Sequence, residues 1–142
     1  MTAPLTREYR AALGDVDAAG VIYFAAVFRW HEAGLSEWLI RDYEPLSHIL
    51  AKGFGLPVVA CSADYSDGIA LDDLLQLTSR VSEIGTTSFV FETTITREGS
   101  PACSVRTKHV WTHRTDHDGF RSLPLPQGLR QSLEASNGSK GS

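Results

Sequence analysis

Cysteine is scarce in this 142-residue sequence, which contains only Cys61 and Cys103. Two cysteines are too few for a disulfide scaffold, and without a CxxC pair they indicate neither a zinc site nor a redox motif. Both lie in apolar or β-prone segments, so we expect two small buried thiols. Positive charge is also limited, because 13 Lys and Arg face 17 Asp and Glu. This acidic balance argues against general nucleic-acid binding.

Long apolar runs are absent as well. None reaches the roughly 18 residues that a membrane helix needs, and the N-terminal residues lack the apolar core of a secretory signal. The phosphate-binding loops GxGxxG and GxxxxGKS/T and the nucleophile motif GxSxG are also missing. Apolar residues nevertheless make up 42% of the chain, which is typical of a globular protein. We therefore expect one cytoplasmic domain without a nucleic-acid or membrane partner.

One long amphipathic helix is predicted over residues 22–40. Apolar side chains recur there at steps of three and four, and no proline interrupts the pattern. The stripe consists of Phe24, Val27, Phe28, His31, Leu35, Trp38 and Leu39. A helix of this length, roughly 28 Å at about 1.5 Å per residue, needs a broad surface to cover its apolar face.

Predicted strands supply that surface. Residues 5–13 suit a first strand, residues 14–20 a loop, and residues 44–53 an irregular or short helical stretch. Four β-prone segments follow, and the middle two alternate clearly with a period of two. They span residues 56–66, 74–84, 88–98 and 102–115. Their short links imply antiparallel pairing, and hence an α+β fold with a long helix against a sheet of at least five strands.

The domain is expected to cover residues 1–128, with a tail over residues 129–142. The start of the tail suits a helical turn. Its end is rich in Ser, Gly, Asn and Lys. Because these residues bury little apolar surface, we expect a flexible segment.

The junction between the loop and the helix is the first candidate site. Asp15, Asp17 and Gly20 precede the predicted helix start. Backbone N–H groups at a helix N-terminus lack intrahelical partners and carry the positive end of the dipole, so they suit a carboxylate or a developing oxyanion. The simpler interpretation is that an Asp caps the helix and Gly20 permits the turn, and composition alone favours it.

The sequence DVDAAGVIYF at residues 15–24 strengthens the catalytic interpretation. It resembles the Asp-x-Asp-x-x-Gly-Val-(Val/Ile)-Tyr/Phe motif of hotdog-fold acyl-CoA thioesterases of the 4-hydroxybenzoyl-CoA thioesterase family. The likeness covers about residues 6–126. It is closer still to the 1,4-dihydroxy-2-naphthoyl-CoA thioesterases, through HEA at 31–33, EWL at 37–39, LPVV at 56–59 and LPLPQ at 123–127. The resemblance implies a long central helix wrapped by an antiparallel sheet.

The resemblance also implies roles for residues of the motif. Asp17 would act as the nucleophile on the thioester or as the general base on water. The backbone N–H of Phe24, one turn into the predicted helix, would polarise the thioester carbonyl. Gly20 and Tyr23 would contact the substrate, and Asp15 would shape the loop.

Further candidates lie outside the motif. His31 lies on the apolar helix face, where a hydrogen-bonded core histidine is the alternative to a functional one. Together with Glu32 it would line the acyl pocket and bond a ring hydroxyl. The resemblance also implies a strand Ser or Thr near the catalytic carboxylate, for which Thr86, Thr87 and Ser88 are the eligible residues.

Coenzyme A carries phosphates, so an acidic protein needs local cations to bind it. By strand parity, Arg106, Lys108 and Arg114 share one face of the last strand, where they either meet these phosphates or form a solvated face. The resemblance implies a homo-oligomer, a tetramer built from dimers, with sites between subunits.

No metal or cofactor is expected, since coenzyme A is part of the substrate. Three histidines spaced by four, His109, His113 and His117, lie in a β-prone stretch that lacks a known zinc motif. A period of two would place His109 and His113 on one strand face.

The resemblance makes hydrolysis of an aromatic acyl-CoA the predicted function. The best substrate is 1,4-dihydroxy-2-naphthoyl-CoA, an assignment that implies menaquinone or phylloquinone synthesis. 4-Hydroxybenzoyl-CoA or a short-chain acyl-CoA is the alternative substrate. A hotdog domain that binds an acyl ligand without turnover is the alternative of another class.

Overall fold

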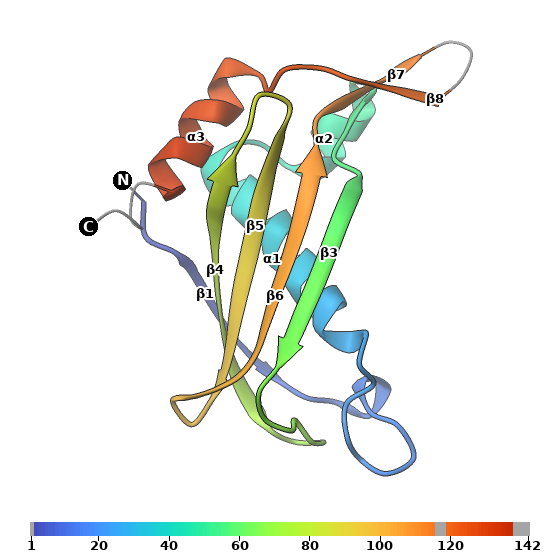
Figure 1. Cartoon of the computed structure of the whole chain (residues 1–142), viewed down its shortest axis with the longest axis vertical. Helices are drawn as coiled ribbons and strands as arrows, with labels where there is room; N and C mark the ends of the chain where they lie inside the picture. Colours follow the sequence, from blue (N-terminus) through green and yellow to red (C-terminus); the bar gives the residue numbers. More distant parts are fainter. Residues whose placement is uncertain (1, 116–118, 138–142) are drawn as a thin grey trace.

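The computed structural model describes residues 2–115 and 119–137, and shows one antiparallel sheet wrapped around one long helix (Figure 1). The strand order of the sheet is β1-β4-β5-β6-β3. Its strands are β1 (Leu5–Arg10), β3 (Val58–Tyr65), β4 (Leu74–Ile84), β5 (Ser88–Arg97) and β6 (Ser100–Val110). Helix α1 (Ala26–Asp42) crosses one face of it. This arrangement confirms the predicted α+β hotdog architecture.

A smaller sheet and three short helical elements complete the fold. The small sheet has the order β2-β7-β8 and contains β2 (Phe54–Gly55), β7 (Thr112–Thr115) and β8 (Gly119–Ser122). The helical elements are the 3₁₀ turn η1 (Leu13–Asp15), α2 (Leu46–Ala51) and α3 (Gln127–Asn137). None of the described helices combines the length and the apolar character needed to cross a membrane.

Helix α1 begins four residues later than predicted, at Ala26. The predicted helix begins at Ile22, but the backbone of residues 21–22 pairs sideways instead. Val21 forms an isolated antiparallel bridge with Ala70, and Ile22 forms another with the preceding loop. Backbone groups used in such bridges are not available for the first helical turn. Phe24 therefore lies two residues before α1 rather than one turn inside it.

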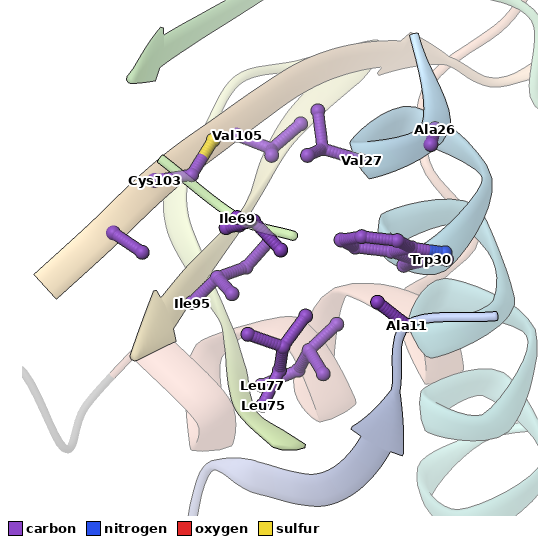
Figure 2. Packing of buried hydrophobic residues seen from close by; sticks show 11 residues of the cluster. Ala11, Ala26, Val27, Trp30, Ile69, Leu75, Leu77, Ile95, Cys103 and Val105 are labelled. Carbon is purple, nitrogen blue, oxygen red and sulfur yellow. The ribbon is translucent and has the colours of Figure 1, made fainter. Parts of the chain in front are cut away.

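The amino-terminal half of α1 packs against the inner face of the sheet (Figure 2). Val27 and Trp30 are buried there, and Figure 2 shows both side chains directed from the helix toward the strands. The opposing buried residues are Ile69, Leu75, Leu77, Ile95, Cys103 and Val105. Farther along α1, Trp38 and Leu39 are fully buried in a second cluster with Phe89 and Phe91. Each such side chain contributes about 1.5–3 kcal/mol through burial.

Residues 129–137 belong to helix α3, so the predicted flexible tail is wrong for this segment. Leu129 and Leu133 are one helical turn apart, and both are fully buried in the second core cluster. Their shared apolar face is what attaches the helix to the rest of the domain. Residues 138–142 lie outside the described residues.

The strand predicted over residues 102–115 is divided at Trp111. The Trp111 N–H donates to the carbonyl of Thr87 at 2.8 Å, and the Trp111 carbonyl accepts the N–H of Leu123 at 3.0 Å. The chain changes partners at this residue, which ends β6 and begins β7 in the small sheet.

The two cysteines differ in their surroundings. Cys103 is buried as expected, whereas Cys61 is exposed, which corrects the prediction for that residue. Cys61 lies in β3, an outer strand of the main sheet whose side chains are nearly all exposed. The apolar character of the segment did not reveal its outer position.

Candidate active site

The predicted catalytic loop folds into a tight antiparallel turn. The Asp17 N–H donates to the Val21 carbonyl at 2.9 Å, and the Gly20 N–H donates to the Asp17 carbonyl at 3.0 Å. Gly20 has a φ of +79°, in the left-handed region that glycine adopts at little cost. This conformation confirms that Gly20 is the residue that permits the turn.

The turn presents a carboxylate and an amide that are open to a ligand. Asp17 is exposed, and its Oδ1 accepts the Ala19 N–H at 2.8 Å. Across residues 2–115 and 119–137, neither Oδ2 of Asp17 nor the backbone N–H of Phe24 has a hydrogen-bond partner. Asp17 therefore offers a group that can attack or deprotonate, and Phe24 offers a donor just ahead of α1 that can bind an oxyanion.

Two aromatic side chains adjoin this turn. Tyr23 and Phe24 are 53% and 65% exposed, and their ring centroids are 4.9 Å apart. The Tyr65 hydroxyl donates to the Phe24 carbonyl, which ties this segment to the end of β3. Between the two segments lies a cleft of about 410 Å³. It is lined by Val21, Ile22, Phe24, Tyr65, Ser66, Asp67, Gly68 and Ile69.

Asp15 anchors the loop from inside the protein. Its side chain is buried, and its Oδ2 accepts the Tyr9 hydroxyl at 2.5 Å and the Ala12 N–H at 2.8 Å. Oδ1 accepts the Trp30 indole N–H and an Arg29 N–H, both at 3.2 Å. Burial alone would raise the pKa of Asp15, but these hydrogen bonds and the Arg29 charge outweigh it and lower the pKa. The ionised Asp15 side chain thus anchors the loop, in agreement with its predicted loop-shaping role.

A large cavity lies at α1, α2, the small sheet, β3 and β6, and has a volume of about 640 Å³. This size suits a small-molecule ligand. Its apolar lining includes Phe28, Leu35, Leu46, Leu50, Phe54, Leu56, Pro57, Val58 and Phe120. Its polar and charged lining includes His31, Glu32, Ser36, Thr107, His109 and Arg114. Asp17 does not line this cavity. Within a single chain, the predicted catalytic carboxylate therefore lies outside the predicted acyl pocket.

His31 connects α1 to three strands in the wall of the cavity. It is 1% exposed, and its Nδ1 and Nε2 lie 2.6 Å and 2.7 Å from the hydroxyls of Thr93 and Thr107. Thr93 in turn lies 2.7 Å from the hydroxyl of Ser79. Burial, followed by nearby positive charge, lowers the pKa of His31 from 6.5 to about 3. The ring is therefore a neutral, fully hydrogen-bonded histidine that also borders the cavity.

The direction of every bond in this network is fixed by one backbone carbonyl. His109 Nδ1 lies 3.0 Å from the Leu56 carbonyl, which can only accept, so Nδ1 carries the proton. Neutral His109 then accepts at Nε2 from the Thr107 hydroxyl, 2.7 Å away. Because the Thr107 hydroxyl donates its proton to His109, its oxygen accepts the Nε2–H of His31. Nδ1 of His31 then accepts the hydroxyl proton of Thr93. Burial also lowers the pKa of His109, which favours this neutral arrangement.

The three predicted coenzyme A-binding cations do not share a face. Arg106 and Lys108 are exposed and border a hollow of about 270 Å³, where Arg106 pairs with Glu83 and, at 3.3 Å, with Glu92. Arg114 instead borders the large cavity, because the break at Trp111 interrupts the parity of the strand. Arg114 has no acidic partner within the described part of the chain.

The remaining predicted residues are dispersed. Ser88 begins β5, at the opposite end of the sheet from the Asp17 turn, so one chain does not bring them together (Figure 1). His113 packs against Phe54 with ring centroids 4.7 Å apart, and His117 lies outside the described residues. Sequence reasoning missed Thr93 and Thr107, whose inward strand positions were the only available signal.

The sequence matches the family described as "Thioesterase-like superfamily" over residues 11–133. The chain belongs to this family. It is 30% identical over 128 residues to a 1,4-dihydroxy-2-naphthoyl-CoA hydrolase from Synechococcus sp. (strain RCC307), covering 87% of this chain and 95% of the relative. It is 28% identical over 100 residues to a 4-hydroxybenzoyl-CoA thioesterase from Pseudomonas sp. (strain CBS-3), covering 68% of each chain.

A solved structure of a 1,4-dihydroxy-2-naphthoyl-CoA thioesterase from Synechocystis has the same fold. Its TM-score is 0.82 at 24% identity, and the likeness covers 92% of this chain and 95% of that one. The predicted resemblance and the hotdog fold are therefore confirmed. Relatives named as acyl-CoA hydrolases or thioesterases support the predicted class of enzyme, an acyl-CoA thioesterase. The roles of individual residues stay predictions.

Proposed function

We propose that this thioesterase hydrolyses an aromatic acyl-CoA, with 1,4-dihydroxy-2-naphthoyl-CoA as its best substrate. Relatives with that named activity reach about 30% identity over nearly the whole chain, which supports the assignment. 4-Hydroxybenzoyl-CoA is the second candidate, because a relative with that named activity aligns over two thirds of the chain. A role in menaquinone or phylloquinone synthesis and a cytoplasmic location stay predictions.

The observation that carries the proposal is the open pair at the turn: the Asp17 carboxylate and the Phe24 N–H. The amide donates to the thioester oxygen as negative charge develops on it, an effect typically worth about a hundred- to a thousandfold in rate. Asp17 acts in one of two ways. As nucleophile, its oxygen bonds to the acyl carbon, the thiolate of coenzyme A leaves and takes up a proton, and water opens the anhydride. As base, it takes a proton from the attacking water.

The large cavity supplies the acyl site in this proposal. Its apolar walls suit an aromatic ring, and Glu32 adds an acceptor for a ring hydroxyl. Arg114 borders the same cavity and has an unpaired guanidinium among the described residues, so we assign it to a phosphate of coenzyme A. Because Asp17 does not border this cavity in its own chain, we propose that the site is completed in a homo-oligomer, a tetramer built from two dimers.

Asp17→Asn tests the proposal, with Asp64→Asn, an exposed change on β3, as the matched control. Release of the free thiol, of coenzyme A or of the acyl carrier, is followed with a thiol reagent over aryl-CoA, aliphatic acyl-CoA and carrier-linked thioesters. We expect kcat on the best aryl-CoA to fall at least a hundredfold in Asp17→Asn and to stay within twofold in the control. Tight binding of aryl-CoA without release would instead identify a binding domain. Faster turnover of every aliphatic substrate would contradict the aromatic assignment alone.

A further inference from the structure

Arg97, the last residue of β5, binds three groups of the loop between β3 and β4. Its Nη2 lies 2.6 Å from an Asp67 carboxylate oxygen, and its Nη1 lies 2.9 Å from Oδ2 of Asp73. Nη1 also donates to the carbonyl of Gly68. One guanidinium therefore holds both ends of the loop over residues 67–73.

The same carboxylates also fix the backbone of this loop. Asp67 Oδ1 accepts the Gly68 N–H at 2.8 Å, and Asp73 Oδ2 accepts the Ala70 N–H at 2.8 Å. Ile69, between them, is 1% exposed and belongs to the first core cluster. The apolar side of the loop is thus held by the burial of Ile69. Its polar side depends on the ion pairs of Arg97 with Asp67 and Asp73.

This loop is the lateral support of the Asp17 turn. The Leu71 N–H donates to the Gly20 carbonyl at 3.0 Å, and the Ile22 N–H donates to the Ile69 carbonyl at 3.0 Å. Both segments lie at the same end of the sheet in Figure 1. The segment of the turn that the loop supports, residues 20–22, also contains the Val21 carbonyl, which accepts the Asp17 N–H. A continuous series of hydrogen bonds therefore connects Arg97 to the backbone of Asp17.

We propose that Arg97 is a positioning residue for catalysis: it fixes the 67–73 loop, and this loop holds the turn that presents Asp17 and the Phe24 N–H. The inference rests on the proposed function, since it assigns Arg97 a role through the Asp17 turn. Removing the guanidinium leaves the Asp67 and Asp73 carboxylates without their shared cation and releases the Gly68 carbonyl. The loop then shifts, and a displacement on the order of 1 Å at a reacting group costs about a hundredfold in rate.

The test uses Arg97→Ala, Arg97→Lys and a matched control, Arg41→Ala. Arg41 likewise joins a carboxylate, of Asp42, to a loop carbonyl, of Ala3, but it lies in the last turn of α1. We expect kcat of Arg97→Ala to fall about 10- to 100-fold while KM stays within threefold, and Arg97→Lys to retain an intermediate kcat. Low millimolar guanidinium should restore Arg97→Ala severalfold, because the site is open to solvent, and should leave Arg41→Ala unchanged.

Two results would overturn the inference. One is a kcat of Arg97→Ala within twofold of the wild type. The other is a loss of activity that follows a lowered melting temperature and that guanidinium does not restore, because that result shows a purely structural role. Asp17→Asn, measured in parallel, separates the two proposals. If the wild type releases no coenzyme A from any aryl-CoA, the proposed function fails. If Asp17→Asn keeps full activity, the role of Asp17 fails, and with it a role of Arg97 that acts through Asp17. An inactive Asp17→Asn beside an active Arg97→Ala rejects only the role of Arg97.

Discussion

The neutral state of His31 makes a quantitative prediction about stability and pH. Burial lowers the pKa of His31 to about 3 in the folded protein, from 6.5 in an unfolded chain. Between these values the unfolded state takes up a proton that the folded state excludes. The contribution of His31 to the free energy of unfolding is therefore fully present above pH 6.5 and falls as the pH is lowered, by about 1.4 kcal/mol per pH unit.

The expected loss from His31 is about 2 kcal/mol between pH 7 and pH 5. This is a large part of the roughly 5–15 kcal/mol that stabilises a typical domain. Urea denaturation of the wild type and of His31→Gln at pH 7, 6 and 5 isolates the contribution of His31. Glutamine keeps a donor and an acceptor for Thr107 and Thr93 but does not titrate. Contributions of His109 and the carboxylates are shared by both proteins, so they cancel in the comparison.

The wild type should lose about 2 kcal/mol more than His31→Gln over this pH range, whatever the stability of the variant at pH 7. Equal pH dependence in the two proteins would refute the reasoning. So would an NMR titration in which His31 protonates near its ordinary value in the folded protein. The same spectra test the order of the network, because they should show the proton on Nε2 of His31 and on Nδ1 of His109.

Two more substitutions test the site. Asp15→Asn replaces one carboxylate oxygen with an NH₂ group, which cannot accept the hydrogen bonds that this oxygen accepts now. Urea denaturation should therefore show that the free energy of unfolding falls by about 1–3 kcal/mol. Unchanged stability would contradict the anchoring role. Arg114→Ala should raise KM for an aryl-CoA about 3- to 10-fold with kcat within twofold, the range expected for one ionic contact to a phosphate. The KM for a truncated thioester without phosphates should not change, and an equal rise for both substrates would reject the phosphate contact.

Local patterns predicted the elements whose own residues determine them. Strand β4 has the predicted bounds, residues 74–84, and its buried positions alternate from Leu75 to Val81. The start of α1 depends on partners far away in the sequence, since Ile22, the first residue of the predicted helix, donates its N–H to the Ile69 carbonyl instead. Strand β2 has two residues, which is too short for any alternation to show.

The same distinction applies to the candidate site. The composition of the loop predicted the turn at Gly20, because a left-handed residue is a local requirement. The hydrogen-bonded wall around His31 depends on the register of β5 against β6, which places Thr93 and Thr107 beside one ring. The position of Arg114 depends on the change of partners at Trp111, which parity along one strand does not reveal.

The strand order also determines when the chain can fold during synthesis. β1 pairs with β4, and β3 pairs with β6, so both outer strands wait for partners made much later. Until residues 100–110 have left the ribosome, α1 has only part of the sheet to cover its apolar side. Folding is therefore expected to be delayed until late in translation and to be slow, as is usual when most pairings are distant in sequence.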